Sequence, residues 1–225
     1  MDKKYVIAVD GPAASGKSTT AKCLAEKLHY VYIDTGAMYR ACGLCALQNN
    51  IKLSDAAALQ QMLESIEIKI IYSNSGNEIL MNNEDVSQRI READVTKISS
   101  EIAVIGAVRE KMVELQRNMG ADGGVILDGR DIGTVVFPEA EFKFFMNASV
   151  KERATRRWQE SQISGTDISY EDVEKELIWR DKNDSTRKIS PLRQAADAIA
   201  IDTTSLSIEE QVNFLYNYIQ KHWEK

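Results

Sequence analysis

The sequence predicts an α/β protein built on a five-stranded parallel sheet. Five short apolar runs have the composition of buried strands: Tyr5–Val9, Tyr30–Ile33, Gly124–Leu127, Phe142–Met146 and Ala198–Ile201. Helical segments separate them, and this alternation is typical of parallel sheets with helices on their faces. Several runs end in an acid or a small polar residue. Because ligands of open α/β sheets bind at the carboxyl ends of the strands, we expect one functional edge there.

The first strand leads into a phosphate-binding motif. Gly11–Ser18 (GPAASGKS) fits the P-loop pattern G-x-x-x-x-G-K-[ST], and the following residues, Thr19–Leu28, are predicted to be helical. Glycines let backbone N–H groups converge on phosphate oxygens, and the helix start adds positive partial charge. Lys17 is predicted to bridge the β- and γ-phosphates of ATP, and Ser18 to ligate Mg²⁺. The predicted nucleotide-binding residues are Gly11, Pro12, Ala13, Ala14, Ser15, Gly16, Lys17, Ser18 and Thr19. A plain Gly-rich turn would require both the Lys-Ser pair and the strand context to be accidental.

A second phosphate-binding segment follows the second strand. Asp34–Arg40 (DTGAMYR) offers a helix N-terminus, a hydroxyl, an aromatic ring and an arginine one turn later. On this motif alone a structural interpretation carries equal weight. Asp34 would then be an N-cap, Tyr39 a core ring and Arg40 a solvated charge.

The segment between the second and third strands is too long for one crossover, and we interpret it as an insertion. Its predicted elements are helices at Thr35–Asn49 and Asp55–Leu63, strands at Ile66–Tyr72 and Glu78–Met81 around a turn at 73–77, and a helical stretch at Ala93–Met119 broken near Ile105. We expect no separate domain, because its apolar content is too small to hold a core.

The third strand ends in a segment that carries several charged residues. Asp128 resembles a Walker B acid, which would hold Mg²⁺ directly or through water. Arg130 and Asp131 emerge at the same edge, between Gly129 and Gly133. The glycines favour close approach of a ligand, and the alternative is a structural salt bridge between the two charges.

Two charged helices, Val150–Gln162 and Ser169–Arg187, flank a polar turn at 163–167, and Pro191 follows them. This region and its flank contain half of the arginines: Arg153, Arg156, Arg157, Arg180, Arg187 and Arg193. Few apolar residues anchor the hairpin, so we expect it to be mobile. The arginines could form a solvated face with glutamate partners. In a P-loop protein we favour a closing lid whose arginines neutralise charge on the transferred phosphoryl group.

Composition limits the partners and the location. The net charge of −6 gives no general attraction to nucleic acid or anionic lipid, and no apolar run reaches the length of a membrane span. The start of the chain does not resemble a signal peptide. Cys42 and Cys45 form a C-x-x-C pair without a second pair, so we expect them, with Cys23, to be buried or half-buried thiols in a reducing compartment. The prediction is a cytoplasmic monomer that binds neither nucleic acid nor membranes.

The catalytic residues of hydrolases are not apparent. We find no obvious general base and no Ser-His-Asp or Cys-His set. A phosphate acceptor, with a second pKa of about 6, is already ionised at pH 7 and needs no base. A hydroxyl acceptor normally does need one.

Together these motifs resemble the nucleoside monophosphate kinases, and most closely the bacterial cytidylate kinase family. The resemblance spans nearly the whole chain. It is carried by Asp10–Ser18, Asp34–Arg40, the insertion from Ile66 to about Asp85, Leu127–Pro138, Arg180–Leu192 and Ile201–Glu209. Family members often have Gly-Lys-Gly-Thr where this chain has Gly-Lys-Ser-Thr at 16–19, and some have serine in place of Thr35, which keeps the hydroxyl.

The resemblance implies ATP-dependent phosphorylation of CMP and dCMP, with ATP as co-substrate and Mg²⁺. It implies a single P-loop kinase domain over 1–225, with a core of 1–34, 120–150 and 190–225, an acceptor-binding region at 35–119 and a lid at about 151–189. The implied catalytic residues are Lys17, Arg130, Arg153, Arg157, Arg180 and Arg187. Ser100, Arg109 and Asp131 would contact cytosine; Tyr39, Arg180 and Asp184 the sugar; and Arg40, Arg130 and Arg187 the acceptor phosphate. Thr35 is a further substrate-binding residue, Ser18 and Asp128 would hold Mg²⁺, and the loop 201–204 would border adenine.

Two other hypotheses remain. The chain could be a P-loop kinase for another small acceptor, such as shikimate or UMP. It could also be a nucleotide-dependent switch, which the lack of an N-K-x-D motif disfavours.

Overall fold

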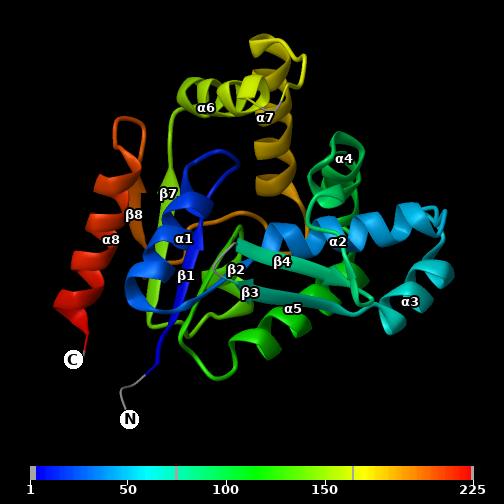
Figure 1. Cartoon of the computed structure of the whole chain (residues 1–225), viewed down its shortest axis with the longest axis horizontal. Coiled ribbons are helices and arrows are strands. Elements are labelled where there is room, and N and C mark those ends of the chain that lie inside the picture. The colour runs from blue at the N-terminus through cyan, green and yellow to red at the C-terminus, as the bar shows by residue number, and fades with distance from the viewer. Residues whose placement is uncertain (1–3, 74–75, 164, 224–225) are drawn as a thin grey trace. The chain divides into compact units, whose positions relative to one another are not determined.

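The computed structural model describes residues 4–73, 76–163 and 165–223 of the chain (Figure 1). The predicted turns at 73–77 and 163–167 include residues 74–75 and 164, which lie outside the described residues. The chain divides into two compact units. The first contains Met1–Tyr32 and Asp122–Lys225, and the second contains Ile33–Ala121.

The first unit is built on the five-stranded parallel sheet, and this confirms the predicted fold class. The strand order is β2-β6-β1-β7-β8, so β1 is central. The strands are β1 (Val6–Asp10), β2 (Val31–Asp34), β6 (Val125–Gly129), β7 (Phe142–Asn147) and β8 (Ile199–Asp202), with the boundary between the units falling inside β2. Each strand lies within about a residue or two of its predicted run. The P-loop therefore leaves the middle of the sheet.

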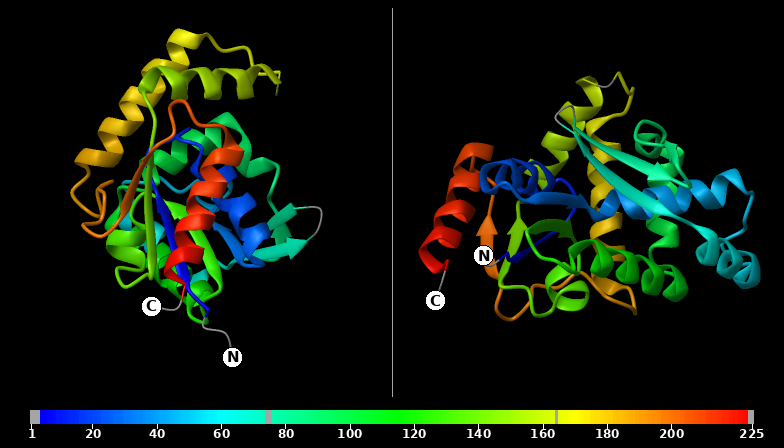
Figure 2. Two further views of the ribbon diagram at one scale, coloured as in Figure 1. Left: turned by 90° about the vertical axis from the view of Figure 1, so that its left-hand side faces the viewer. Right: turned by 60° about the horizontal axis from the view of Figure 1, so that its bottom comes forward.

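Alternate side chains of these strands are buried beneath two helices. Ile7, Val9 and Phe144 are at most 1% exposed, and Leu24 and Leu215 reach them from the helices. The helices are α1 (Lys17–Leu28) and α8 (Ile208–His222), which pack against each other (Figure 2). Helix α8 was not predicted from the sequence. Its start is fixed by a capping box, in which Ser207 and Glu210 each bond the other's backbone N–H.

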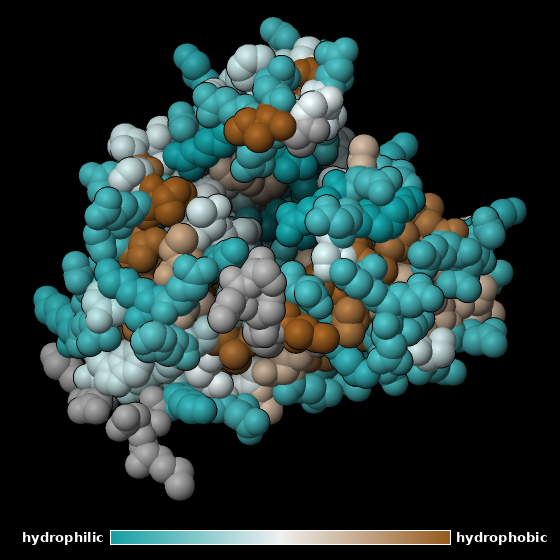
Figure 3. Space-filling model, viewed as in Figure 1, coloured by the Kyte–Doolittle hydropathy of each residue, from teal (hydrophilic) through white to brown (hydrophobic). Residues whose placement is uncertain are grey.

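The two predicted charged helices are confirmed as α6 (Val150–Ile163) and α7 (Tyr170–Thr186), and we call this hairpin the lid. Its apolar core consists of Ala154, Val173 and Leu177, and Ala13 and Ala14 of the P-loop pack against that core. The core is small, as the sequence led us to expect. On the face shown in Figure 3, hydrophilic residues at the top, over the lid, surround a few exposed apolar ones.

The second unit combines helices with a small antiparallel sheet of order β3-β4-β5. Its elements are α2 (Thr35–Gln48), α3 (Ala56–Ser65), β3 (Ile68–Ser73), β4 (Gly76–Met81), β5 (Glu84–Asp85), the 3₁₀ turn η1 (Arg89–Arg91), α4 (Ala93–Ile102) and α5 (Gly106–Gly120). The break predicted near Ile105 is confirmed, because Ile105 caps α5. The short strand β5 was not predicted.

The cysteines are free thiols, as expected. Cys42 and Cys45 are buried in α2, and Cys23 is half-buried. Burial raises the pKa of the Cys42 thiol to about 12, so it stays protonated and unreactive at neutral pH. Among the residues that the structure describes, no helix combines the length and the apolar character that crossing a membrane requires.

Candidate active site

The P-loop has a backbone shape that side chains at two positions would prevent. A Cβ atom on Gly11 would lie 2.0 Å from the carbonyl oxygen of Met146, and one on Gly16 would lie 2.8 Å from Oε1 of Gln211. Gly16 also has a left-handed φ of 87°, which favours glycine. Within this loop the Ser15 hydroxyl is buried and has no hydrogen-bond partner among the described residues. A buried polar atom without a protein partner suits a loop that receives a phosphate oxygen.

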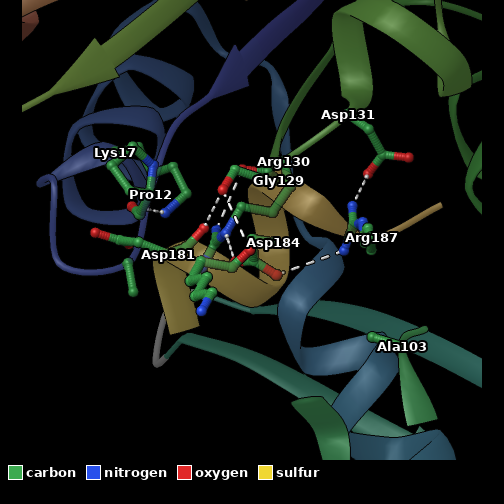
Figure 4. Close-up of polar contacts among 12 residues, drawn as sticks. Pro12, Lys17, Ala103, Gly129, Arg130, Asp131, Asp181, Asp184 and Arg187 are labelled. Carbon is green, nitrogen blue, oxygen red and sulfur yellow. Dashed lines mark hydrogen bonds and ion pairs between the residues drawn. The ribbon is translucent and has the colours of Figure 1, made fainter. Parts of the chain in front are cut away.

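Lys17, the first residue of α1, points back into this loop. Its side chain is buried, and Nζ donates to the carbonyl oxygen of Pro12 at 2.9 Å (Figure 4). Burial, and then the neighbouring Arg130 guanidinium, lower the pKa of Lys17 to about 7, although Asp128 opposes them. The ammonium form is therefore disfavoured until negative charge, such as phosphate, enters the loop.

The two residues predicted to hold Mg²⁺ are in contact. Ser18 Oγ donates to Asp128 Oδ2 at 2.6 Å, and the Tyr32 hydroxyl donates to Asp128 Oδ1 at 2.8 Å. Asp128 lies in β6, opposite Val9 of β1, and is only 4% exposed. A hydroxyl and a carboxylate oxygen are hard donors that suit Mg²⁺, so these residues fit the predicted ion.

A row of alternating charges joins the loop after β6 to helix α7. Arg130 Nε pairs with Asp184 Oδ2 at 2.8 Å, and Arg187 lies 3.5 Å from both Asp184 Oδ1 and Asp131 Oδ1 (Figure 4). Burial raises the pKa of the Asp184 carboxyl, but Arg130, Arg180 and Arg187 outweigh it and hold that pKa below its ordinary value. Arg130 and Arg180 both lower the pKa of Lys17, and Arg187 acts with them on Asp184, so these four predicted catalytic cations belong to one charged cluster at the P-loop.

Arg153 is bound by acceptors from three segments. It is 3% exposed; Nε donates to the Ala148 carbonyl oxygen at 2.9 Å, and Nη1 to the Ala13 carbonyl oxygen at 3.3 Å. Both terminal nitrogens bond Asp181 of α7, at 3.0 and 2.7 Å. This bidentate pair joins the two lid helices, and the Ala13 contact joins them to the P-loop.

The neighbouring arginines of α6 face elsewhere. Arg156 donates to the Thr203 carbonyl oxygen at 2.6 Å, which ties α6 to the loop predicted to border adenine. Arg157 has a side chain that is 51% exposed and pairs with Glu160 at 3.2 Å. The lid arginines thus differ in environment, which their clustering in the sequence did not reveal.

Two buried polar residues support the P-loop from the C-terminal part of the chain. The sequence analysis included Thr203 only as part of the loop 201–204, and it did not name Gln211. Thr203 Oγ1 donates to the Ser15 carbonyl oxygen at 2.9 Å. Gln211 accepts from Thr20 Oγ1 at 2.7 Å and donates to the Leu206 carbonyl oxygen at 2.8 Å. Gln211 lies on the otherwise apolar face of α8, and this pattern in the sequence could have indicated a buried polar role.

In the second unit, the start of α2 has both features that the sequence suggested. Asp34 is the N-cap, accepting from the Ala37 N–H at 2.8 Å. The same carboxylate binds Arg40 Nη2 at 3.0 Å, and Arg40 Nε is buried without a hydrogen-bond partner among the described residues. A Cβ at Gly36 would lie 3.1 Å from Arg40 Nη1, so the glycine gives the guanidinium room over the helix start. Arg40 is therefore not a solvated charge.

Two other predicted substrate residues meet in this unit. The Arg109 guanidinium lies over the Tyr39 ring, 5.5 Å from its centroid, and Nη1 donates to the Ala103 carbonyl oxygen at 3.2 Å. Ser100 is half-buried on α4, and Thr35 is buried at the first position of α2. Asp131, the third residue predicted for cytosine, belongs to the first unit.

Comparison with known proteins identifies the family. The family described as cytidylate kinase matches residues 7–221. The chain belongs to the cytidylate kinase family. The cytidylate kinase of Bacillus velezensis is 52% identical over 221 residues, which cover 98% of this chain and 99% of that protein. That of Carboxydothermus hydrogenoformans is 50% identical over 213 residues, which cover 95% and 96%.

Solved structures support the fold. A shikimate kinase from Bacteroides thetaiotaomicron has a TM-score of 0.51 at 12% identity and covers 97% of this chain and 99% of its own. At this identity the likeness shows a shared fold alone. Family membership confirms the prediction of a phosphotransferase that acts on CMP with ATP.

The state of Lys17 predicts proton uptake when ATP binds. With a pKa of about 7 in the empty site, Lys17 is mostly neutral at about pH 8 and mostly charged at about pH 6. Triphosphate raises that pKa, so binding should take up close to one proton at the higher pH and little at the lower. Calorimetry in two buffers of different ionisation enthalpy measures this number. Lys17→Met should lose most of the uptake at the higher pH, where ATP itself is already fully ionised. Undiminished uptake by the variant at about pH 8 would contradict the assignment to Lys17.

Proposed function

We propose that this chain transfers the γ-phosphoryl group of ATP directly, in line, to the phosphate of CMP and of dCMP. The observation that carries the proposal is the convergence of Lys17, Arg130, Arg180 and Arg187 beside the P-loop. Phosphoryl transfer spreads negative charge over the transferred group, and catalysis rests on positioning and on neutralising that charge. Four cations from three segments, of which Lys17 is buried and the three arginines are half-buried, supply this neutralisation.

The P-loop residues 11–19 bind the triphosphate in this proposal. The buried Ser15 hydroxyl and the loop amides meet phosphate oxygens, and Lys17 exchanges its bond to Pro12 for one to phosphate. Ser18 Oγ and Asp128 Oδ2, which lie 2.6 Å apart, would hold Mg²⁺, whose charge would offset that of the triphosphate.

The acceptor needs no general base in this reaction. Its phosphate is ionised at neutral pH and attacks without losing a proton. We assign Arg40, Arg130 and Arg187 to hold it; Arg40 qualifies because its Nε is buried and without a partner among the described residues. Tyr39, Arg180 and Asp184 are assigned to the sugar, and Thr35 supplies a buried hydroxyl at the helix start.

Cytosine is assigned to Ser100, Arg109 and Asp131. The base presents an amino donor beside the acceptors N3 and O2, so a carboxylate and a guanidinium complement it. Arg109 and Asp131 are each at most 5% exposed. Uracil reverses the donor and acceptor pattern at these positions, and buried groups left unpaired make such a site selective.

Arg153 and Arg157 complete the proposed catalytic arginines. To reach the transferred group, Arg153 must exchange its bonds to Asp181 and Ala13, and Arg157 must leave Glu160. The two arginines would exchange these partners when the lid opens and closes.

We also propose that the protein acts as a cytoplasmic monomer without nucleic-acid or membrane partners.

Replacing Lys17 tests the proposed transfer. Lys17→Met should lower kcat by about 10²–10³, because one electrostatic contact to the developing charge is lost. Lys22→Met, on the exposed face of the same helix, is the control and should keep wild-type activity. A coupled assay of ADP release with CMP measures both variants. A folded Lys17→Met protein with near-wild-type kcat would falsify the assignment.

Replacing Asp131 tests the proposed recognition of cytosine. Asp131→Asn keeps the shape of the side chain but adds a hydrogen-bond donor. The value of kcat/KM for CMP should therefore fall, and the fall should correspond to a loss of roughly 1–3 kcal/mol of transition-state stabilisation. UMP should lose less, because the amide can donate to its O4 atom, and the CMP:UMP ratio should narrow. Steady-state kinetics with both acceptors gives this ratio. If both acceptors lose the same factor, Asp131 only braces the loop through Arg187.

A further inference from the structure

Asp10, the last residue of β1, is a buried carboxylate that the proposed reaction does not use. It is 4% exposed. Its Oδ1 accepts from the Ile132 N–H and its Oδ2 from the Gly133 N–H, each at 2.8 Å. These two amides begin the π-helical turn η2 (Ile132–Val136). The carboxylate therefore caps a turn that lies far away in the sequence.

This arrangement is costly for a residue that only fills space. Among the described residues Asp10 makes no salt bridge, although the Lys17 charge favours its ionised form, and a buried carboxylate without a direct ion pair is unfavourable. Burial raises its pKa to about 7, while the Gly133 and Ile132 amides oppose the shift. Both oxygens must act as acceptors to satisfy the two amides. An asparagine of the same shape would turn an amino group toward one of them.

Because of its position in the chain, Asp10 connects two segments of the proposed site. Gly11 follows it and starts the P-loop. Ile132 follows Arg130 and Asp131, which pair with Asp184 and Arg187. The carboxylate thus joins the first residue of the phosphate loop to the segment that carries two proposed acceptor ligands.

We propose that Asp10 is a positioning residue that sets the acceptor-binding segment 129–133 in its working position beside the P-loop. The proposal rests on the assignment of Arg130 and Asp131 to the acceptor. In this proposal Asp10 does not contact either substrate. It acts through the Ile132 and Gly133 amides on the two residues that precede them.

The P-loop itself has other supports, so the effect should fall on the acceptor. Gly11 packs against the Met146 carbonyl, Thr203 bonds the Ser15 carbonyl, and Gln211 lies against Gly16. None of these contacts involves Asp10. Its loss should therefore weaken CMP binding and leave ATP binding almost unchanged.

The test compares Asp10→Asn with Val9→Ala. Val9 is the preceding residue of the same strand and is fully buried, so its truncation destabilises β1 without touching the amides. Asp10→Asn should raise KM for CMP about 5–100-fold and narrow the CMP:UMP ratio, with Kd for ATP within about twofold of wild type. Val9→Ala should lower Tm and leave all three quantities unchanged. Equal changes in the two variants, or parallel losses of ATP and CMP affinity, would overturn the proposal.

A second variant serves if Asp10→Asn does not fold. A Cβ at Gly133 would lie 3.4 Å from Asp10 Oδ2 and 3.2 Å from the aliphatic part of the Lys143 side chain. Gly133→Ala should therefore shift the hydrogen bond between Asp10 and the Gly133 amide without removing the carboxylate. It should change KM for CMP in the same direction, again without changing ATP affinity. An unchanged KM for CMP in folded Gly133→Ala would reject the positioning role.

Comparing the Asp10→Asn and Asp131→Asn variants distinguishes a failure of the positioning role from a failure of the proposed recognition of cytosine. If Asp131→Asn keeps the CMP:UMP ratio while Asp10→Asn still raises KM for CMP, the assignment of Asp131 fails and Asp10 acts through Arg130. If Asp131→Asn narrows the ratio and Asp10→Asn behaves as wild type, only the positioning role fails.

Discussion

Reciprocal hydrogen bonds between the ends of β1 and β6 are the interaction on which the rest of the site depends. The two strands are neighbours, with Asp10 opposite Gly129 and Val9 opposite Asp128. Asp10 of β1 accepts hydrogen bonds from two backbone amides of the turn after β6. Asp128 of β6 accepts a hydrogen bond from the hydroxyl of Ser18, in the helix after β1. Each strand thus holds the segment that follows the other. Parallel pairing brings both segments to the same edge, and the carboxylates fix how they lie there.

Lys17, Arg130 and Arg153 depend on this framework because each is held by protein acceptors rather than by water. Lys17 is buried where its ammonium form is disfavoured, and Arg130 is held by Asp184 of the lid. Arg153 links the same lid to the Ala13 carbonyl through a guanidinium that is almost fully buried. These protein acceptors hold the side chains near the P-loop before substrate arrives, and Arg153 and Lys17 then exchange protein acceptors for phosphate. Phosphate then supplies the anionic partner that the Lys17 ammonium lacks in the empty loop.

The sequence was sufficient where the signal is local. Apolar runs ending in polar residues located the five strands, and the glycines with Lys17 and Ser18 located the phosphate loop. It was not sufficient where the hydrogen-bond partner of a side chain lies far away in the sequence. Asp10 finds amides 122 and 123 residues away, and Arg153 finds Asp181 on the other lid helix, while Arg157 with the same chemistry pairs within its own helix. No periodicity separates these cases, because burial and strand order decide them. The strand β5 was missed since two residues carry too little pattern.

Hydrogen exchange at the Ile132 and Gly133 amides tests most directly whether Asp10 holds the segment after β6. In the wild-type protein, measured by NMR, both amides should exchange slowly, because each donates to a buried carboxylate. In Asp10→Asn they should lose protection selectively, whereas the Val135 and Val136 amides, which donate to the Asp131 carbonyl oxygen, should keep theirs. Fast exchange at Ile132 and Gly133 in the wild type, or an equal loss at all four amides in the variant, would contradict the account.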